Sequence, residues 1–189
     1  MIIMTYSIKI DPETGLLHSI PYKASPHCDA RPQLIVIDMI VIHNISLPPN
    51  QFGGQAIEAF FCGELDFSQH PFFVSISHLK VSAHLLIKRK GEIIQFVPFN
   101  KRAWHAGESC FAGRSRCNDF SIGIELEGTD ELPYEQVQYS QLSQIIRSLM
   151  RIYPEICLER IVGHADIAPE RKTDPGPAFD WGQLRASLR

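Results

Sequence analysis

The sequence lacks the features that mark exported, membrane-spanning and nucleic-acid-binding chains. Its first eleven residues contain no basic region followed by an apolar run and a small-residue cleavage site, so we expect no signal peptide. No apolar run is long enough to span a bilayer. The formal net charge of −3 gives no general attraction to nucleic acid or to a membrane surface. We therefore expect neither of these as a partner.

Cysteine is too sparse and too irregular to staple the fold. The five cysteines are odd in number and no two of them form a C-x-x-C pair, so neither a disulfide framework nor a cysteine zinc finger is indicated. A reducing compartment fits this pattern, and we expect a cytoplasmic location. The chain also has no internal repeats and no low-complexity segment.

What is present is the composition of an ordinary globular domain. The 189 residues are 44% hydrophobic and 21% charged, which predicts one domain with a sizeable core. We expect a single domain over residues 1–189 and a monomer. Residues 1–33 are polar and broken by prolines, which predicts an irregular start with one short strand at most, and about the first 20 residues form an extra leader.

Hydrophobic periodicity predicts strands and helices in a mixed order. Residues 34–42 (LIVIDMIVI) predict a central strand covered on both faces, with His43 and Asn44 at its end. Residues 120–127 alternate like a strand that places Gly123, Glu125 and Glu127 on one face. Further predictions are helices over 55–62, 134–153 and 179–188, a hairpin of 84–88 with 93–97, a short strand over 160–163, and irregular chain over 63–82. These elements predict an α/β fold with a mixed sheet flanked by helices.

A polar loop over residues 163–177 carries a concentration of reactive side chains. Its prolines and glycines argue against a regular helix or central strand, and the prolines restrict its freedom. His164 opens this loop and Asp174 closes it. Together with His43 they make a candidate three-ligand zinc site with an open position, the pattern of catalytic zinc. For any one of these histidines a hydrogen-bonded structural role remains the alternative.

The sequence also offers a second metal reading. His164-Ala165-Asp166 is an H-x-D, as in the two-His-one-carboxylate site of non-haem iron oxygenases. Those proteins place a further histidine after the H-x-D, and here none follows His164. The jelly-roll strand pattern is missing as well, so we disfavour this reading.

Several other side chains have both a catalytic or binding interpretation and an ordinary one. Glu125 is either a general base whose pKa is raised by burial or an outward-facing residue, and Glu127 shares its face, so spacing does not choose between them. Lys172 is either an oxyanion-stabilising cation or a solvated loop lysine. Candidates for substrate binding, each of which could instead be surface charge or core packing, are Lys80, His105, Arg116 and Arg171.

Four sequence runs resemble the zinc N-acetylmuramoyl-L-alanine amidases. They are residues 41–49 (VIHNISLPP), 104–107 (WHAG), 117–129 (CNDFSIGIELEGT) and 163–177 (GHADIAPERKTDPGP). The resemblance covers about 22–184 and is strongest to the branch that acts on 1,6-anhydro-muropeptides in cell-wall recycling. It implies a mixed sheet with helices on both sides.

The resemblance also implies roles for individual residues. His43, His164 and Asp174 would bind one zinc ion, Glu125 rather than Glu127 would be the catalytic carboxylate, and Lys172 the second catalytic residue. Asn44, His105, Arg116 and Arg171 would contact substrate. Lys80 stands where the family has an arginine, which changes a two-pronged donor into a point charge.

The implied activity is hydrolysis of the amide between (1,6-anhydro-)N-acetylmuramic acid and L-alanine in soluble muropeptides. Two alternatives are a non-catalytic muropeptide sensor on the same fold and a different zinc peptidase. The sensor is disfavoured because the ligand set, the glutamate and the lysine are all present.

Overall fold

The computed structural model describes residues 8–189. Their strands are β1 (Cys28–Ala30), β2 (Met39–Ile45), β3 (Leu85–Ile87), β4 (Ile93–Gln95), β5 (Lys101–Ala103), β6 (Cys110–Phe111), β7 (Arg114–Ser115), β8 (Ser121–Glu127) and β9 (Ile161–Gly163). Their α-helices are α1 (Ala56–Phe61), α2 (Pro71–Ile76), α3 (Gln136–Ile152), α4 (His164–Ile167) and α5 (Trp181–Leu188). Short 3-10 turns are η1 (Phe67–Gln69), η2 (Cys117–Asp119) and η3 (Leu158–Arg160).

A five-stranded mixed sheet forms the centre of the molecule, in the order β4-β3-β8-β2-β9. Strands β3, β8, β2 and β9 run parallel, and β4 joins the edge antiparallel to β3. Every residue of β8 is buried, as expected of a parallel strand covered on both faces. Two small sheets, β1-β5 and β6-β7, lie outside this central sheet.

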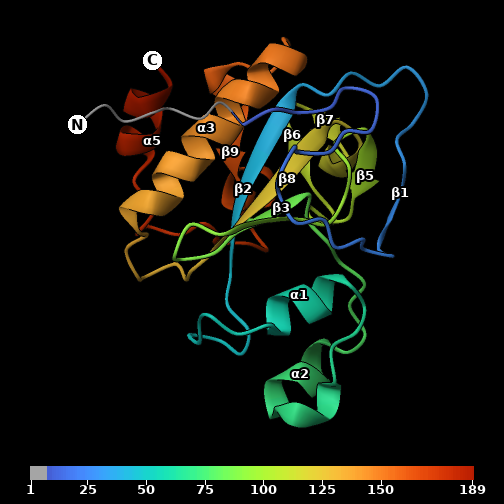
Figure 1. Cartoon of the computed structure of the whole chain (residues 1–189), viewed down its shortest axis with the longest axis vertical. Coiled ribbons are helices and arrows are strands. Elements are labelled where there is room, and N and C mark those ends of the chain that lie inside the picture. Colours follow the sequence, from blue (N-terminus) through green and yellow to red (C-terminus); the bar gives the residue numbers. More distant parts are fainter. Residues whose placement is uncertain (1–7) are drawn as a thin grey trace.

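One face of the sheet is covered by the two longest helices, α3 and α5 (Figure 1). The apolar stripe of α3 packs there against inward side chains of β2 and β8, among them Ile42 and Ile124. A capping box between Glu135 and Gln138 starts α3, because each side chain accepts a hydrogen bond from the other's backbone N–H. The helix predicted over 134–153 is confirmed.

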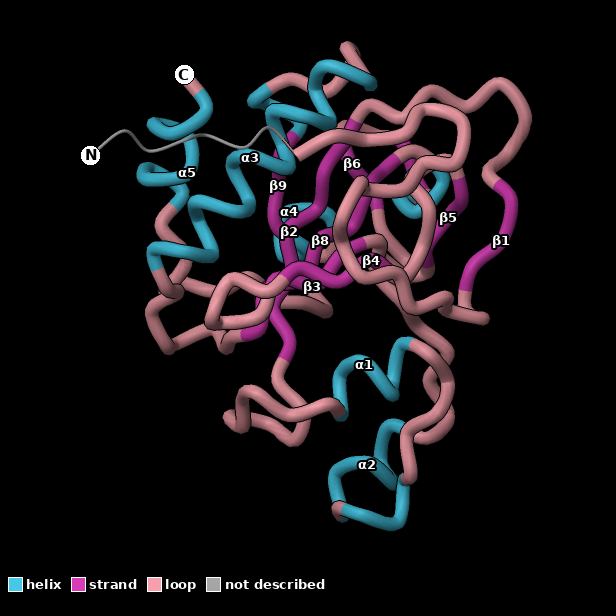
Figure 2. The backbone as a smooth tube through the Cα atoms, viewed as in Figure 1, coloured by secondary structure: helices cyan, strands magenta, loops and turns pink. Residues whose placement is uncertain are grey.

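The opposite face is covered by shorter pieces. Met39 and Val41 of β2 pack there with Cys117 of η2 and Ile167 of α4. Figure 2 shows α4 as a single short coil beside the strands. Helices therefore lie on both faces, and the mixed α/β arrangement is confirmed. No helix among residues 8–189 is long and apolar enough to cross a membrane.

Helices α1 and α2 lie beyond the end of the sheet at which the chain leaves β2 (Figure 1). A second apolar cluster holds α1 to the sheet, with Phe60 and Phe61 packed near Leu86 and Phe96. Irregular chain was predicted over 63–82, and this is wrong in part, since η1 and α2 form there. Proline at the first position of α2 fits a helix start, where its missing N–H costs nothing.

Two further predictions need correction. The central strand covers Met39–Ile45, later than the predicted 34–42, so His43 and Asn44 lie within it. Leu34 is fully exposed with φ +61°, because the partner strands begin to pair only at Met39 and Ile40. The loop after β9 does contain helix, since α4 completes one turn before Pro169.

Residues 8–20 pack against the rest of the molecule. Ile10 and Leu17 are buried in the same cluster as α3. The backbone N–H of Leu17 donates to Gln95 Oε1 at 2.8 Å, and Gln95 Nε2 donates back to the carbonyl of Gly15 at 2.9 Å. The remainder of the predicted leader, residues 1–7, lies outside the described residues.

Candidate metal centre and catalytic cleft

Strand register brings two of the predicted site residues together. In the parallel pair of β2 and β8, His43 lies opposite Glu125. Strand β9 lies on the other side of β2, and His164 follows its last residue. Because the carboxyl ends of parallel strands meet at one edge of a sheet, these three side chains share that edge.

Asp174 is brought to the same edge by the fold of its loop. The backbone N–H of Ala165 donates to the carbonyl of Asp174 at 2.9 Å, which ties the loop's end to the start of α4. A Cβ at Gly163 would lie 2.7 Å from Pro175 Cδ, so only glycine allows this close approach. The Tyr134 hydroxyl fixes the next residue by donating to the carbonyl of Pro175 at 2.8 Å.

Three potential ligand atoms converge at this point. His43 Nδ1 lies 2.9 Å from His164 Nδ1 and 3.0 Å from Asp174 Oδ2, and His164 Nδ1 lies 3.1 Å from Asp174 Oδ2. His164 Nε2–H donates to the carbonyl of Ala106 at 3.2 Å, which leaves a lone pair on Nδ1. Tetrahedral zinc with bonds of about 2.0–2.1 Å separates its ligand atoms by about 3.3 Å. The group therefore fits a metal ion. Among the described residues it is the group of histidine, cysteine or acidic side chains that lie close enough together to hold one.

The protonation states favour this interpretation. Burial, the largest influence, lowers the pKa of His43 to about 4, so its ring is neutral at pH 7. Burial alone would raise the pKa of Asp174, but its close polar contacts with His164 and His43 outweigh burial and hold that pKa below its ordinary value. The neutral imidazole of His43 and the carboxylate of Asp174 are the forms that bind zinc.

Glu125 is buried beside this centre without a full set of partners. Its Oε2 has no hydrogen-bond partner, which is rare for a buried carboxylate. Burial raises its pKa well above the ordinary value, the charge of Asp174 raises it further, and the charge of Lys172 opposes both. Lys172 is half-buried and lines the same cleft. A buried carboxyl of raised pKa next to a metal centre is suited to moving protons.

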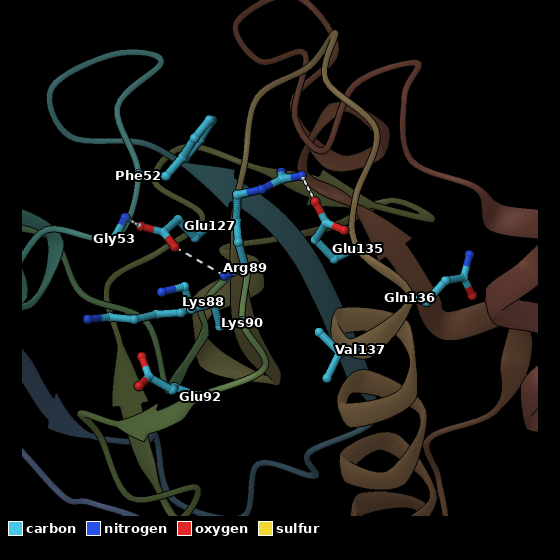
Figure 3. A pocket seen from close by; sticks show the side chains of 10 residues that line it. All are labelled: Phe52, Gly53, Lys88, Arg89, Lys90, Glu92, Glu127, Glu135, Gln136 and Val137. Atoms are coloured by element: carbon cyan, nitrogen blue, oxygen red, sulfur yellow. Dashed lines mark hydrogen bonds and ion pairs between the residues drawn. The ribbon is translucent and has the colours of Figure 1, made fainter.

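Glu127 has a different environment two residues further along β8. Figure 3 shows its carboxylate joined to Gly53 on one side and to Arg89 on the other. The backbone N–H of Gly53 donates to Oε1 at 2.6 Å, and the backbone N–H of Arg89 donates to Oε2 at 3.1 Å. The structure thus separates two glutamates that their spacing in the sequence does not distinguish, because Glu127 ties two loops together.

A cleft of about 270 Å³ opens on the metal centre. One side is polar and contains His43, His164, Asp174, Glu125 and Lys172. The other side is apolar and comes from the segments around α1 and α2; its residues are Leu47, Phe60, Phe61, Phe72, Ile76, Leu79 and Val81. Sequence reasoning missed this wall. The five phenylalanines between residues 60 and 73 were the available signal.

The side chains proposed for substrate binding divide into two groups. Asn44 and His105 line the cleft. The amide of Asn44 donates to Asp130 Oδ1 at 2.7 Å and to the carbonyl of Pro175 at 3.2 Å. Both ring nitrogens of His105 contact other side chains, His43 at 3.0 Å and Ser121 at 3.2 Å. The polar atoms of Asn44 and His105 named here are therefore engaged with other residues of the chain.

The three basic candidates do not reach the cleft. Lys80 is exposed and is not among the cleft residues, although Leu79 and Val81 beside it are. Arg116 is exposed and pairs with Asp119 at 3.3 Å. Arg171 Nη2 donates to the carbonyls of Ala106 and Glu108, both at 2.7 Å, and so anchors the loop that carries His164 and Asp174. That these residues bind substrate stays a prediction.

The rival H-x-D reading finds no support in the geometry. Asp166 is exposed, and its Oδ2 accepts a hydrogen bond from the backbone N–H of Gly163 at 2.7 Å. The carboxylate that joins the two histidines is that of Asp174.

Comparisons with a family model, with known sequences and with solved structures all point to the same protein family. A family model described as N-acetylmuramoyl-L-alanine amidase matches residues 32–177. The 1,6-anhydro-N-acetylmuramyl-L-alanine amidase AmpD of Escherichia coli (strain K12) is 58% identical over 173 residues, which cover 92% of this chain and 94% of that protein. A crystal structure of a Se-Met AmpD derivative has a TM-score of 0.91 at 54% identity, covering 95% of this chain and 99% of the other.

A more distant solved structure contains a ligand. It is a complex of the N-acetylmuramyl-L-alanine amidase AmiD from E. coli with the substrate anhydro-N-acetylmuramic acid-L-Ala-D-gamma-Glu-L-Lys. Its TM-score is 0.59 at 32% identity, and the match covers 83% of this chain and 60% of that one.

Proposed function

This chain belongs to the N-acetylmuramoyl-L-alanine amidase family, and on that premise we propose that it is a zinc enzyme of cell-wall recycling. Its substrates would be soluble 1,6-anhydro-muropeptides, and the bond cleaved is the amide between N-acetylmuramic acid and L-alanine. The observation that carries the proposal is the convergence of three lone-pair atoms of His43, His164 and Asp174 beside the buried Glu125.

His43, His164 and Asp174 are the residues that would hold the zinc ion. Three protein ligands leave a coordination position open to water or substrate. When bound, zinc supplies a Lewis acid that polarises the amide carbonyl and lowers the pKa of a water molecule. Because burial lowers the pKa of His43, that histidine needs no deprotonation before it binds the metal.

Glu125 would move the proton. As a carboxylate it takes a proton from the attacking water, whose oxygen forms the new bond to the amide carbon. The carbon–nitrogen bond then breaks, and Glu125 delivers the same proton to the leaving nitrogen of L-alanine. Burial raises the pKa of Glu125, which makes its carboxylate a stronger base than that of an ordinary glutamate.

Lys172 would stabilise the charge that develops on the carbonyl oxygen. It lines the cleft with Glu125 and the ligand residues, and its charge acts on Glu125 and His43. A fixed cation in a site of low dielectric stabilises an oxyanion more strongly than it does in water.

Residues 8–189 pack around one sheet, which supports a single amidase domain, and we propose that it acts as a monomer in the cytoplasm. The identity to AmpD supports anhydro-muropeptides as substrates. The apolar wall of the cleft suits the carbon skeleton of a sugar, with the scissile amide facing the polar side.

Product analysis tests the proposal. The purified chain is incubated with a soluble anhydro-muropeptide, with added zinc or with a chelator, and the products are identified by mass spectrometry. We expect the free stem peptide and the anhydro-sugar acid with zinc and neither with chelator. Cleavage within the peptide would contradict the amidase assignment. Equal cleavage of intact sacculi would contradict the recycling role alone.

A further inference from the structure

His105 belongs to a chain of buried polar contacts that leads away from the metal centre. His43 Nε2 lies 3.0 Å from His105 Nδ1, and His105 Nε2 lies 3.2 Å from Ser121 Oγ. Ser121 Oγ donates in turn to the carbonyl of Cys117 at 2.6 Å. All four residues are buried, so each contact is formed away from solvent.

The last contact fixes the direction of the others. A carbonyl oxygen only accepts, so the Ser121 hydroxyl proton points to Cys117. Ser121 Oγ must then accept from His105 Nε2–H, which leaves His105 Nδ1 as an acceptor. His43 Nε2 must therefore carry the proton it donates to His105. The free lone pair of His43 consequently lies on Nδ1, the atom that faces His164 and Asp174.

The surroundings hold the His105 ring in this orientation. Its backbone N–H donates to Asn118 Oδ1 at 3.1 Å, and the N–H of Ala106 donates to the same oxygen at 2.8 Å. A Cβ at Gly123 would overlap the His105 ring, so glycine at this position of β8 provides the space for it. The ring is therefore fixed by its backbone, by its two nitrogens and by a neighbouring strand.

We propose that His105 is a positioning residue for the metal, and that the His105–Ser121–Cys117 chain selects the metal-binding tautomer of His43. This inference rests on the proposed zinc function. The proposal gives His105 a role in metal binding. From the sequence, His105 was expected to contact substrate instead. Partners of this kind typically change metal affinity by about 10–100-fold when they are removed.

Two substitutions of His105 whose new side chains have nearly the same shape as each other distinguish the effect of lost hydrogen bonding from the effect of lost packing. His105→Asn keeps an acceptor oxygen near the position of Nδ1, and His105→Leu replaces it with a methyl group. Zinc affinity of the full chain is measured by competition with a chelator, and the Co²⁺-loaded protein gives an absorption spectrum that reports ligand geometry. Denaturant unfolding of the metal-free proteins shows that both variants fold.

We expect His105→Leu to weaken zinc binding by about 10–100-fold and to shift the Co²⁺ spectrum, and His105→Asn to retain most of the affinity. Ser121→Ala should give a smaller loss of zinc affinity, and it serves as the test if the His105 variants do not fold. Equal affinity of His105→Leu and wild type, or equal losses in Leu and Asn, would overturn the positioning role. If only Ser121→Ala folds, an unchanged zinc affinity of that variant would also overturn the positioning role. A wild-type chain that takes up no zinc would overturn the proposed function as well.

Discussion

Glu125 and Glu127 occupy the same strand and the same face, yet their environments are opposite. Both are buried, at 9% and 1% exposure. Glu127 accepts hydrogen bonds from two backbone N–H groups that belong to two loops. Glu125 has an oxygen without a partner, lines the cleft and has a raised pKa. Incomplete hydrogen bonding, rather than burial, therefore distinguishes the carboxylate proposed as catalytic from the structural one.

The same distinction separates the metal centre from the buried charges elsewhere. Glu58 is buried too, but Lys23 and Lys88 both pair with it, so the group is already neutralised. In the His43, His164 and Asp174 group, three potential ligand atoms lie within 3.1 Å of one another, and no lysine or arginine among residues 8–189 pairs with them. That arrangement is costly unless a cation occupies it.

The largest effect should come from removing a metal ligand. We expect His164→Ala and Asp174→Ala each to lose bound zinc and to fall to background activity, because two ligands do not hold the ion. Metal analysis after gel filtration measures the zinc. His18→Ala, a change at an exposed histidine, is the control and should keep a full complement. Full zinc occupancy in either ligand variant would remove that residue from the site.

The next effect should come from Glu125→Gln. We expect the hydrolysis rate to fall by about 10²–10⁴-fold, the usual contribution of a general acid–base, while zinc is retained. Glu127→Gln is the matched control, since it makes the same change two residues along the strand. If Glu127→Gln lost more activity than Glu125→Gln at equal zinc content, the assignment along β8 would be reversed.

Lys172→Ala should have a comparable or smaller effect. We expect a loss of about 10²–10³-fold in kcat with zinc retained, as found when one oxyanion donor is removed. Lys9→Ala, at an exposed lysine, controls for the loss of one positive charge. Near-normal turnover of the zinc-loaded variant would return Lys172 to the class of solvated loop lysines.

The pH dependence should reflect Glu125. Only its carboxylate accepts a proton from water, so protonation at low pH removes the base. Because burial raises its pKa, activity should begin to fall at a higher pH than for an ordinary glutamate of pKa about 4.3. Below the pKa, kcat/KM of the zinc-loaded enzyme should fall by about tenfold per pH unit. The residual activity of Glu125→Gln should not show this fall at low pH. If the fall persisted in that variant, it would be assigned to another titrating group.

The smallest effect on catalysis should come from Glu127→Gln, whose cost appears in stability. Glutamine presents one amide nitrogen where a backbone donor needs an acceptor, so one of the two hydrogen bonds is lost. We expect the free energy of unfolding to fall by about 1–3 kcal/mol, measured by denaturant titration of the metal-free protein. An unchanged unfolding midpoint would show that these bonds contribute nothing net.

The three residues of the candidate metal site could be picked out from the sequence because each lies in a distinctive local pattern. His43 follows an apolar run that reads as a central strand, and His164 and Asp174 bracket a loop restricted by prolines. The role of His105 was not predictable in this way, because its partners Ser121 and Cys117 come from a segment 12 to 16 residues further on. Hydrogen-bond direction within such a set is a property of the folded neighbourhood alone.

The sequence by itself determined the mixed α/β composition, the long helix, the hairpin and the residue types of the site, since hydrophobic period and turn residues act locally. Tertiary structure alone decided the start of the central strand, which depends on where neighbouring strands pair. It also gave Glu125 and Glu127 different surroundings, because a period of two places both on one face and only the surrounding loops determine which carboxylate is hydrogen-bonded.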